Sequence, residues 1–557
     1  MQTVPVVIAG GGPGGLTLAI ELGRRGVECV VFNDKPGTAT LPAANATQAR
    51  TMEHFRRLGF AQELRVLGMP GDYPTDITYF TRYSRHELAR FKLPPSGAAA
   101  KVARQASGSW STPELPHRCS QLYIEQVLFK HAGAQPGVSL RFGWRVVSFE
   151  DDGEGVNVTA EKVDGGGRIT LRCSYLVGVD GARSMVRESL GLELEGERKV
   201  TRNFVGGRMI ALYIRAPDLY KKIAGPPAWM YWAVNGERRS FMTAIDGVET
   251  FAFHTQLKVD EERRDISDDE ARRFFDQSMG CACDIEIMGK SQWNAGYTLV
   301  ANAYKRGRVM LAGDAVHLFT PMGGLGYNTA VDDVVNLGWK LAAVLKGWGG
   351  EDLLDSYEIE RRPLAIRNTG IARGYADSVG LFIPPDNIED ATSAGEQARA
   401  TAGAYLNDHA RREFNIPGVT FGTRYDGSPV IVSDGKPAPP DNANVYVPSA
   451  VPGGRAPHWW LQGERSLYDS LGFEFTLLQL RDEAAAGSAA FETAARELGI
   501  PLTVLRLSEA DEPGLRDLYE ADLVLIRPDQ HVAWRGGANK LDAAGVLRAV
   551  SGRKAKG

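Results

Sequence analysis

The sequence predicts a protein of mixed α/β and α+β class. An apolar run at residues 4–9 leads directly into the glycine-rich loop 10–15 and then into a helical pattern, which is typical of a βαβ unit. Two later apolar runs end in Asp180-Gly181 and Gly313-Asp314, as strands do at the ligand edge of a parallel sheet. Between them, short alternating runs across residues 188–290 predict an antiparallel sheet.

The composition argues against a nucleic-acid-binding, disulfide-rich, metal-binding or membrane-spanning protein. The 557 residues contain 64 Lys and Arg against 68 Asp and Glu, a net charge of −4, and no cluster of basic residues. We therefore expect no nucleic-acid partner. The five cysteines include no C-x-x-C pair, which predicts free thiols in a reducing compartment and no metal site. The uncharged stretch 3–20 contains several glycines and two prolines, so we expect no membrane span and a cytoplasmic protein.

The loop Gly10-Gly11-Gly12-Pro13-Gly14-Gly15 predicts a phosphate cradle. In the pattern G-x-G-x-x-G, Gly10 permits the tight turn and Gly12 lets the backbone approach a pyrophosphate. Gly15 lets the following helix pack close to the strand. The helix that begins here offers its first N–H groups to anionic oxygen. This segment by itself indicates dinucleotide binding.

An acidic residue is expected at the end of the second strand, where it binds a ribose hydroxyl. The sequence there is Phe32-Asn33-Asp34. Asn33 occupies the usual acidic position and can still hydrogen-bond a hydroxyl, whereas Asp34 follows it. The residues leave the choice between Asn33 and Asp34 open.

Two further strand-and-turn motifs follow. Residues 175–187 combine a strand, the turn Asp180-Gly181 and a helix that Ser184 is placed to cap. Residues 308–315 form a strand that ends in Gly313-Asp314. The loop 321–328 then leads into an amphipathic helix.

These motifs together resemble class A flavoprotein monooxygenases, the FAD-dependent aromatic hydroxylases. GGGPGG matches the first fingerprint of that family, VGVDGARSMVR its Asp-Gly motif and LAGDAVHLFTPMGGLGYN its Gly-Asp motif. A fourth match is RCSQLYIE at residues 118–125. The resemblance runs from about residue 3 to 375, with four motifs in the same order and spacing.

The resemblance implies a bound FAD and a role for each matching residue. The glycine loop would lie against the pyrophosphate, Asp314 would bind the ribityl hydroxyls, and the loop after it would line the flavin ring. Asp180 would support both FAD and a transient NADH or NADPH. The full set of implied cofactor-binding residues is Gly10, Gly12, Pro13, Gly14, Gly15, Asn33, Asp34, Arg50, Arg118, Gln121, Asp180, Gly181, Asp314, Pro321, Gly323, Gly324 and Asn328.

The resemblance also implies the domain organisation. We expect a Rossmann-like FAD-binding domain interleaved with an antiparallel-sheet substrate domain, followed by a thioredoxin-like domain. GGRAPHWWL and LIRPDQHVAWRG carry the likeness of this last domain to the phenol-hydroxylase branch, and it contains no cysteine. We expect it to serve packing or a homodimer. The expected boundaries are 1–71, 106–187 and 291–375 for the FAD domain, 72–105 and 188–290 for the substrate domain, 376–457 for a helical or extended linker, and 458–557 for the last domain.

The implied reaction is hydroxylation of a phenolic aromatic ring with O2 and NAD(P)H through a flavin C4a-hydroperoxide. A base is needed near the phenol oxygen. His254 and Tyr231 are weak candidates on expected sheet strands, as are Tyr213 and Asp246. The alternatives are a flavin-dependent reductase, a halogenase-like oxidoreductase or a non-catalytic flavoprotein. The halogenase signature W-x-W-x-I-P is absent, since Trp229 and Trp232 are three residues apart and no Ile-Pro follows.

Overall fold

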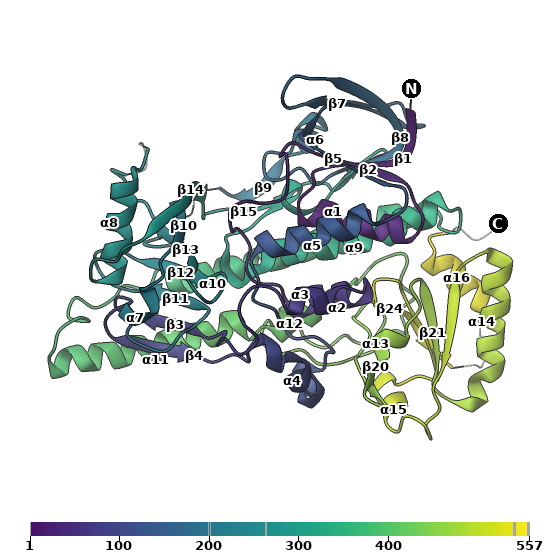
Figure 1. The fold of residues 1–557 in the computed structure, drawn as a ribbon. Helices are drawn as coiled ribbons and strands as arrows, with labels where there is room; N and C mark the ends of the chain where they lie inside the picture. The colour runs from purple at the N-terminus through teal and green to yellow at the C-terminus, as the bar shows by residue number, and fades with distance from the viewer. Residues whose placement is uncertain (1, 199, 201, 262–264, 538–541, 554–557) are drawn as a thin grey trace.

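The structure is a computed structural model that describes residues 2–198, 200, 202–261, 265–537 and 542–553. It contains two large sheets and a smaller C-terminal sheet (Figure 1). The first sheet lies at the top of that view, the second at the left, and the C-terminal sheet at the lower right.

The first sheet is built around the strand that precedes the glycine loop. Strands run in the order β16-β17-β8-β1-β2-β5, and a β6–β7 hairpin extends it from β8. Strands β1, β2, β5, β8 and β17 pair in parallel, as buried apolar runs predict. The strand bounds are β1 Gln2–Ala9, β2 Cys29–Asn33, β5 Val138–Phe142, β6 Trp144–Asp151, β7 Val156–Lys162, β8 Arg168–Gly178, β16 Lys305–Arg306 and β17 Val309–Leu311.

Helices α1 (Pro13–Arg24), α5 (Gln121–Gly133) and α9 (Leu325–Leu345) pack together along this sheet. Their apolar faces and the strands form the largest core cluster, which includes Ile8, Leu18 and Val334. Helix α9 begins directly after the loop at residues 321–324, called the third glycine loop below. The carboxyl ends of β1, β8 and β17 therefore meet the start of two helices, which is the edge where ligands bind in such folds.

The second sheet has the order β14-β10-β13-β12-β11-β3-β4. Its pairs are antiparallel except β11 with β3, which run parallel and come from distant parts of the chain. The strand bounds are β3 Ile77–Phe80, β4 Glu87–Phe91, β10 Arg208–Arg215, β11 Met230–Ala233, β12 Ser240–Ala244, β13 Thr250–Gln256 and β14 Glu286–Asn294. Helix α8 (Asp268–Met279) covers one face, where Phe275 contacts Phe253.

The C-terminal sheet has the order β22-β21-β23-β24. Strands β21 and β22 are parallel and joined by a helix, whereas the other pairs are antiparallel, which gives the expected thioredoxin-like arrangement. The bounds are β21 Phe475–Gln479, α14 Ala485–Leu498, β22 Leu502–Arg506, β23 Leu523–Ile526, β24 Val532–Gly536 and α16 Ala543–Val550.

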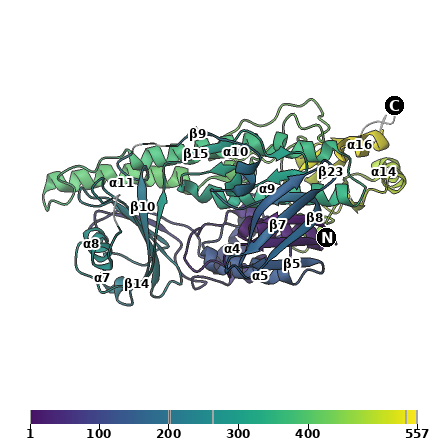
Figure 2. The same ribbon diagram turned by 90° about the horizontal axis from the view of Figure 1, so that it is seen from above.

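Two long helices link these parts. Helix α10 (Asp352–Gly380) packs on α9, and α11 (Ser393–Phe414) packs on β4 of the second sheet. Figure 2 shows both helices running along the molecule from the first sheet toward the second. The segment expected to be a linker therefore contributes a 22-residue helix to the junction between the two sheets.

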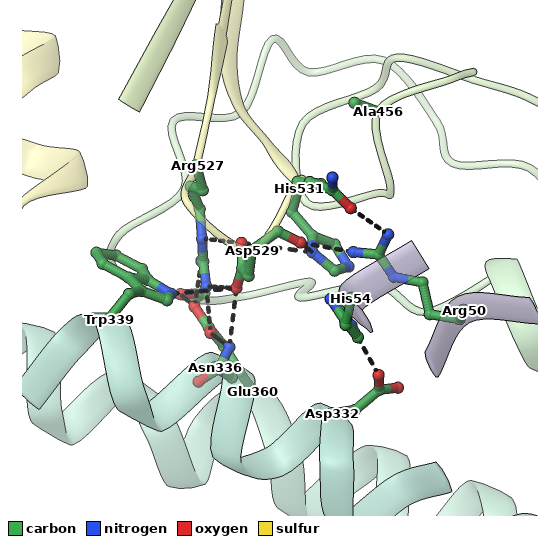
Figure 3. A network of polar contacts seen from close by, with 12 residues as sticks. Arg50, His54, Asp332, Asn336, Trp339, Glu360, Ala456, Arg527, Asp529 and His531 are labelled. Atoms are coloured by element: carbon green, nitrogen blue, oxygen red, sulfur yellow. Dashed lines mark hydrogen bonds and ion pairs between the residues drawn. The ribbon is translucent and has the colours of Figure 1, made fainter. Parts of the chain in front are cut away.

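A buried polar network joins the C-terminal domain to α9 and α10 (Figure 3). Arg527 forms ion pairs with Glu360 and with Asp529, and both carboxylates also accept a hydrogen bond from Asn336. Lys340 donates to the same Glu360 carboxylate at 2.6 Å. These side chains are almost wholly inaccessible to solvent, so the C-terminal domain is fixed to the rest of the protein by charges as well as by apolar contacts.

Among the described residues, no helix is both long enough and apolar enough to cross a membrane.

Candidate cofactor and substrate site

The first glycine loop has the geometry that its sequence predicts. Gly10 has φ +114°, and a Cβ atom there would overlap the carbonyl oxygen of Val179 at the end of β8. A Cβ at Gly15 would overlap the carbonyl oxygen of Gly10, so the helix approaches the strand as closely as two backbones allow. A Cβ at Gly12 would contact nothing within 4 Å. No side chain caps α1, so its first N–H groups are available to an anionic oxygen.

The side chains of Asn33 and Asp34 point in different directions. The Asn33 Oδ1 atom accepts a hydrogen bond from the backbone N–H of Gly11 at 3.2 Å, so its side chain faces the glycine loop. Asp34 is exposed, and its carboxylate lies 3.8 Å from Arg145. The geometry favours Asn33 as the residue that meets a ribose next to the loop.

Asp180 lies in the turn of the strand-and-turn motif at residues 175–187. Its carboxylate accepts hydrogen bonds from the Ser184 hydroxyl and from the backbone N–H of Val186. Ser184 caps α6 (Met185–Ser189), as its position predicts. Burial raises the pKa of Asp180 in spite of these hydrogen bonds. Gly181 has φ +83°, which makes the turn that places this carboxylate at the sheet edge.

Asp314 lies in the short turn Gly313–Ala315 after β17, and its side chain is exposed. The surrounding protein atoms raise the pKa of Asp314 by desolvation, and neighbouring His317 opposes the effect. His317 is fully buried and its Nε2 atom lies 2.7 Å from Asp333 of α9. Asp333 also accepts from Arg361 and from the backbone of Gly313. This carboxylate thereby fixes both sides of the turn that holds Asp314.

The third glycine loop is held by side chains from other elements. Gly323 and Gly324 both have positive φ, +69° and +63°. Gln48 donates to the Gly323 carbonyl at 2.9 Å, and Asn328 donates to the Gly324 carbonyl at 2.6 Å. Asn328 also bonds the backbones of Ala46 and Gln48. Asn328 therefore shapes the loop rather than presenting a free amide to a ligand.

Glu413 of α11 is a functional candidate that we did not predict from the sequence. Its carboxylate accepts the backbone N–H of Gly323 at 2.8 Å, 90 residues away. The His409 Nε2 atom lies 2.9 Å from the second carboxylate oxygen, but the angles are not those of a hydrogen bond. Nothing in the helical pattern of residues 393–414 distinguishes Glu413 from its charged neighbours, because the long-range contact alone makes it special.

Buried polar atoms without partners gather around Glu413. The hydroxyls of Tyr79 and Tyr375 and one Nη of Arg118 make no hydrogen bond within the described part of the chain. Burial, and then the Glu413 carboxylate, raises the pKa of both tyrosines. Burial lowers the pKa of Arg118 to about 10, which Glu413 offsets only in part. Orphaned buried donors of this kind indicate a place for a polar ligand.

Arg118 and Gln121 lie where the first sheet meets the second. The Arg118 guanidinium lies over the ring of Trp229, 4.5 Å from its centroid. Gln121 accepts a hydrogen bond from the backbone N–H of Ala44 and donates one to Glu125, so it supports the loop around residue 44.

Arg50 is directed elsewhere. It pairs with Glu53 and donates to Gln530 and to the Asp529 carbonyl of the C-terminal domain (Figure 3). Three acceptors engage the Arg50 guanidinium in this structure, so contact between Arg50 and a pyrophosphate stays a prediction.

The two base candidates lie on opposite faces of the second sheet. Strand register places His254 beside Phe241 and on the same face as Thr243, which accepts a hydrogen bond from Asn45 of the first domain. Burial lowers the pKa of His254 to about 4, so it is neutral at physiological pH. Tyr231 points to the other face, and its hydroxyl accepts the Ala228 N–H. Tyr231 therefore does not face the site.

Comparison with known proteins agrees with this geometry. Residues 3–371 match the family described as FAD binding domain, and residues 449–553 match the family described as aromatic-ring hydroxylase, C-terminal. The chain is 32% identical to aklavinone 12-hydroxylase of Streptomyces purpurascens, over 99% of both chains. It is 30% identical to phenol 2-monooxygenase of a Pseudomonas strain, over 97% of this chain and 91% of the relative. The structure of the rebeccamycin biosynthetic enzyme RebC with reduced flavin superposes with a TM-score of 0.88, at 32% identity over 99% of this chain and 100% of that one.

The residues present fit FAD. The glycine loop leaves room for a pyrophosphate, the first turn of α1 offers free N–H groups, and Asp314 presents an accessible carboxylate at the sheet edge. The unpartnered Arg118 guanidinium lies at the junction with the second sheet. Because the two family matches together cover most of the chain, this protein belongs to the FAD-dependent aromatic-ring hydroxylase family of flavoprotein monooxygenases.

Proposed function

We propose that this enzyme hydroxylates a phenolic ring with O2, using electrons from NADH or NADPH. The observation that carries the proposal is the juxtaposition of the third glycine loop with Glu413 and the flavin-side face of the second sheet. FAD, when bound, supplies the electron transfer and the activation of oxygen. The chain supplies binding, orientation and proton handling.

The cofactor residues have distinct proposed tasks. The backbone of Gly12 to Gly15 and the start of α1 bind the pyrophosphate, and Asn33 binds the adenosine ribose. Asp314 binds the ribityl hydroxyls, positioned by the Asp333–His317 pair. Asp180 and Gly181 support the cofactor from the end of β8. Arg118 offers its charge at the junction of the two sheets.

Glu413 is the proposed base in place of His254 and Tyr231. It is buried, bonded to the loop that lines the flavin, and next to hydroxyls that lack acceptors. A phenol placed there would give its O–H proton to the free carboxylate oxygen. His409 lies 2.9 Å away, and its other ring nitrogen contacts the Ser378 hydroxyl at 3.0 Å. Rotation of the His409 ring into hydrogen-bond geometry with Glu413 would complete a proton path through Ser378 to half-exposed Tyr405 at the surface.

The domain division proposed is the one expected from the sequence, with α11 added to the flavin site. The nicotinamide partner is proposed to bind transiently, because the chain has one glycine fingerprint of the G-x-G-x-x-G type. A homodimer remains a proposal for the C-terminal domain. A reductase or halogenase-like activity finds no specific support in the site.

The test is stopped-flow absorbance under argon. The FAD-loaded protein is mixed with NADH or NADPH, with and without a panel of mono- and polycyclic phenols. We expect at least one phenol to accelerate bleaching of the oxidised flavin bands, and the same phenol to be converted to a product heavier by one oxygen atom when air is admitted. A protein that does not retain FAD, or that consumes oxygen without forming a hydroxylated product from any phenol, would contradict the proposal.

A further inference from the structure

The second domain holds a large crevice that none of the cofactor residues line. Its volume is about 1240 Å³. Its walls come from the start of β10, the ends of β13 and β14, the loop before β12, and the chain just after α10. Small-molecule sites usually measure about 300–1,000 Å³, so a single phenol ring would leave most of this space empty.

The charge of the lining is strongly unequal. Two acidic residues, Glu237 and Asp386, stand against six basic ones. Glu237 is also paired with Arg82 outside the lining. The basic residues are Arg198, Arg202, Arg208, Arg238, Arg239 and Lys258. Pairing with Asp377 and Glu261 offsets the charges of Arg202 and Arg238, and Arg208 also has an interaction partner. The remaining three cations still outnumber the two acidic residues, so the crevice keeps an excess of positive charge.

Arg239 is the central cation. Its guanidinium donates to the carbonyl oxygens of Val379 and Phe382 at 2.6 and 2.9 Å, at the end of α10. No carboxylate within the described residues pairs with it, and its Nε atom has no partner. Burial lowers the pKa of Arg239 to about 10. Its guanidinium also lies over the Phe204 ring, 5.1 Å from the centroid. A half-buried guanidinium that contacts carbonyls and a ring but no carboxylate attracts an anion.

Aromatic rings connect the crevice to the flavin side of the sheet. Phe204 lines the crevice and lies edge-on to Trp232, with ring centroids 6.0 Å apart. Trp293 lines it as well and lies edge-on to His254 at 5.9 Å. Both Trp232 and His254 are on the face that Asn45 contacts from the first domain. These rings form a packed aromatic layer between the cationic crevice and the face that Asn45 contacts.

We propose that this crevice takes the anionic end of an extended, flat aromatic substrate, with a carboxylate or similar anion at Arg239 and the rings along Phe204 and Trp293. The inference rests on the proposed function, since it names the substrate class of the same site. On this proposal the enzyme would prefer polycyclic aromatic acids to small neutral phenols. The phenolic ring would lie toward Glu413, at the other end of the molecule that binds.

The test measures binding, not turnover, so it stays separate from the proposed function. FAD-loaded protein is dialysed to equilibrium against 9-anthracenecarboxylate or against 9-anthracenemethanol, which keeps the rings and removes the charge. We expect the carboxylate to bind about tenfold more tightly, which corresponds to about 1.4 kcal/mol. Near-molar salt should reduce that preference. Binding of the acid without any phenol-dependent turnover would leave the crevice assignment standing and contradict the hydroxylase.

Variants assign the effect to the crevice. Arg239→Gln should reduce the preference to about twofold or less, whereas Arg168→Gln, on the exposed β7–β8 hairpin, should leave it unchanged. Because Arg239 also holds the end of α10, Lys258→Gln provides a second variant on an exposed part of the lining, and it should weaken the acid selectively. Equal affinity for both probes, no binding of either, or a preference that survives both crevice variants would overturn the proposal.

Discussion

Arg527 of the C-terminal domain and Glu360 of α10 form a two-pronged ion pair, with N–O distances of 2.7 and 2.9 Å. Both side chains are fully buried. Burial alone would raise the pKa of Glu360, but Arg527 and Lys340 hold it at about 2. Arg361, the next residue of α10, bonds Asp333, which orders the Asp314 turn. One helix therefore links the C-terminal domain to the proposed ribityl site.

Removing one partner of this pair should be costly. Arg527→Met would leave Glu360 and Asp529 buried without their main cation, and we expect a loss of about 3–5 kcal/mol. A large fall in melting temperature, together with reduced FAD retention, would show the effect. The matched control is Arg506→Met in the same domain, whose exposed pair with Glu492 should contribute under about 1 kcal/mol. Equal effects of the two variants would contradict a special role for the buried pair.

The ribose assignment can be decided by a pair of variants. Asn33→Ala removes the side chain that faces the glycine loop, and we expect FAD affinity to fall about tenfold, the value of one good hydrogen bond. Asp34→Ala should change FAD affinity by less than about twofold because its carboxylate points to solvent. Fluorescence titration of the apoprotein with FAD measures both. A larger loss in the Asp34 variant would reverse the assignment.

Replacing Asp314 should reduce FAD binding more than replacing either Asn33 or Asp34. We expect Asp314→Ala to be purified with little FAD, since it removes the only proposed partner of the ribityl hydroxyls. Asp164→Ala, in the exposed β7–β8 turn, is a suitable control. The ratio of visible to ultraviolet absorbance gives the FAD content of each. Full occupancy in the Asp314 variant, with normal turnover, would remove this residue from the site.

Replacing Glu413 should separate chemistry from binding. Glu413→Gln keeps an acceptor for the Gly323 N–H but cannot take a proton, so we expect hydroxylation to slow by about 10²–10⁴-fold. FAD content and phenol affinity should stay close to the parent values. The acid-side limb of the pH–rate profile, which reports deprotonation of the base, should disappear. A variant that keeps both this limb and the parent rate would exclude Glu413 as the base.

Stability should fall on acidification because several histidines are buried in the neutral form. Burial lowers the pKa of His254 to about 4 and of His117 and His458 to about 3. The unfolded chain takes up these protons near pH 6.5 and the folded chain only at lower pH, so stability is lost as pH falls from about 6.5 toward 4. Each histidine adds at most about 1.4 kcal/mol per pH unit.

A substitution tests this account of the pH dependence. His254→Phe keeps the stack on Phe241 and removes the titrating group, so melting temperature should depend less steeply on pH. His86→Gln, at an exposed position, is the control and should leave the slope unchanged. An unaltered slope in the His254 variant would show that other groups set the acid limit.

The sequence predicted those parts of the site that short motifs encode. Gly10, Gly15 and Ser184 act as their spacing indicates, because a turn, a close backbone approach and a helix cap are local properties. Contacts between residues far apart in the sequence could not be predicted. Glu413 is one of many charged residues on a helix until α11 is placed beside Gly323. Arg50 lies close to the first motif in sequence, yet its partners are 479 and 480 residues away.

The choice between the two base candidates also depends on distant contacts. His254 and Tyr231 look alike in the sequence, since both are polar residues within apolar strands. Only the register of β11, β12 and β13 shows that one faces the cofactor side and the other faces away. A one-residue difference in register would exchange them.

The contact between Gly323 and Glu413 has a consequence for biosynthesis. The loop that lines the flavin lacks its anchoring carboxylate until some 90 further residues have been synthesised. The Arg50 contacts wait for Asp529 and Gln530, near the end of the chain. The glycine loops of the nascent polypeptide therefore emerge from the ribosome before the carboxylate that anchors the last of them. We expect FAD to be retained only once α11 has been added, and chains truncated before Glu413 to be colourless.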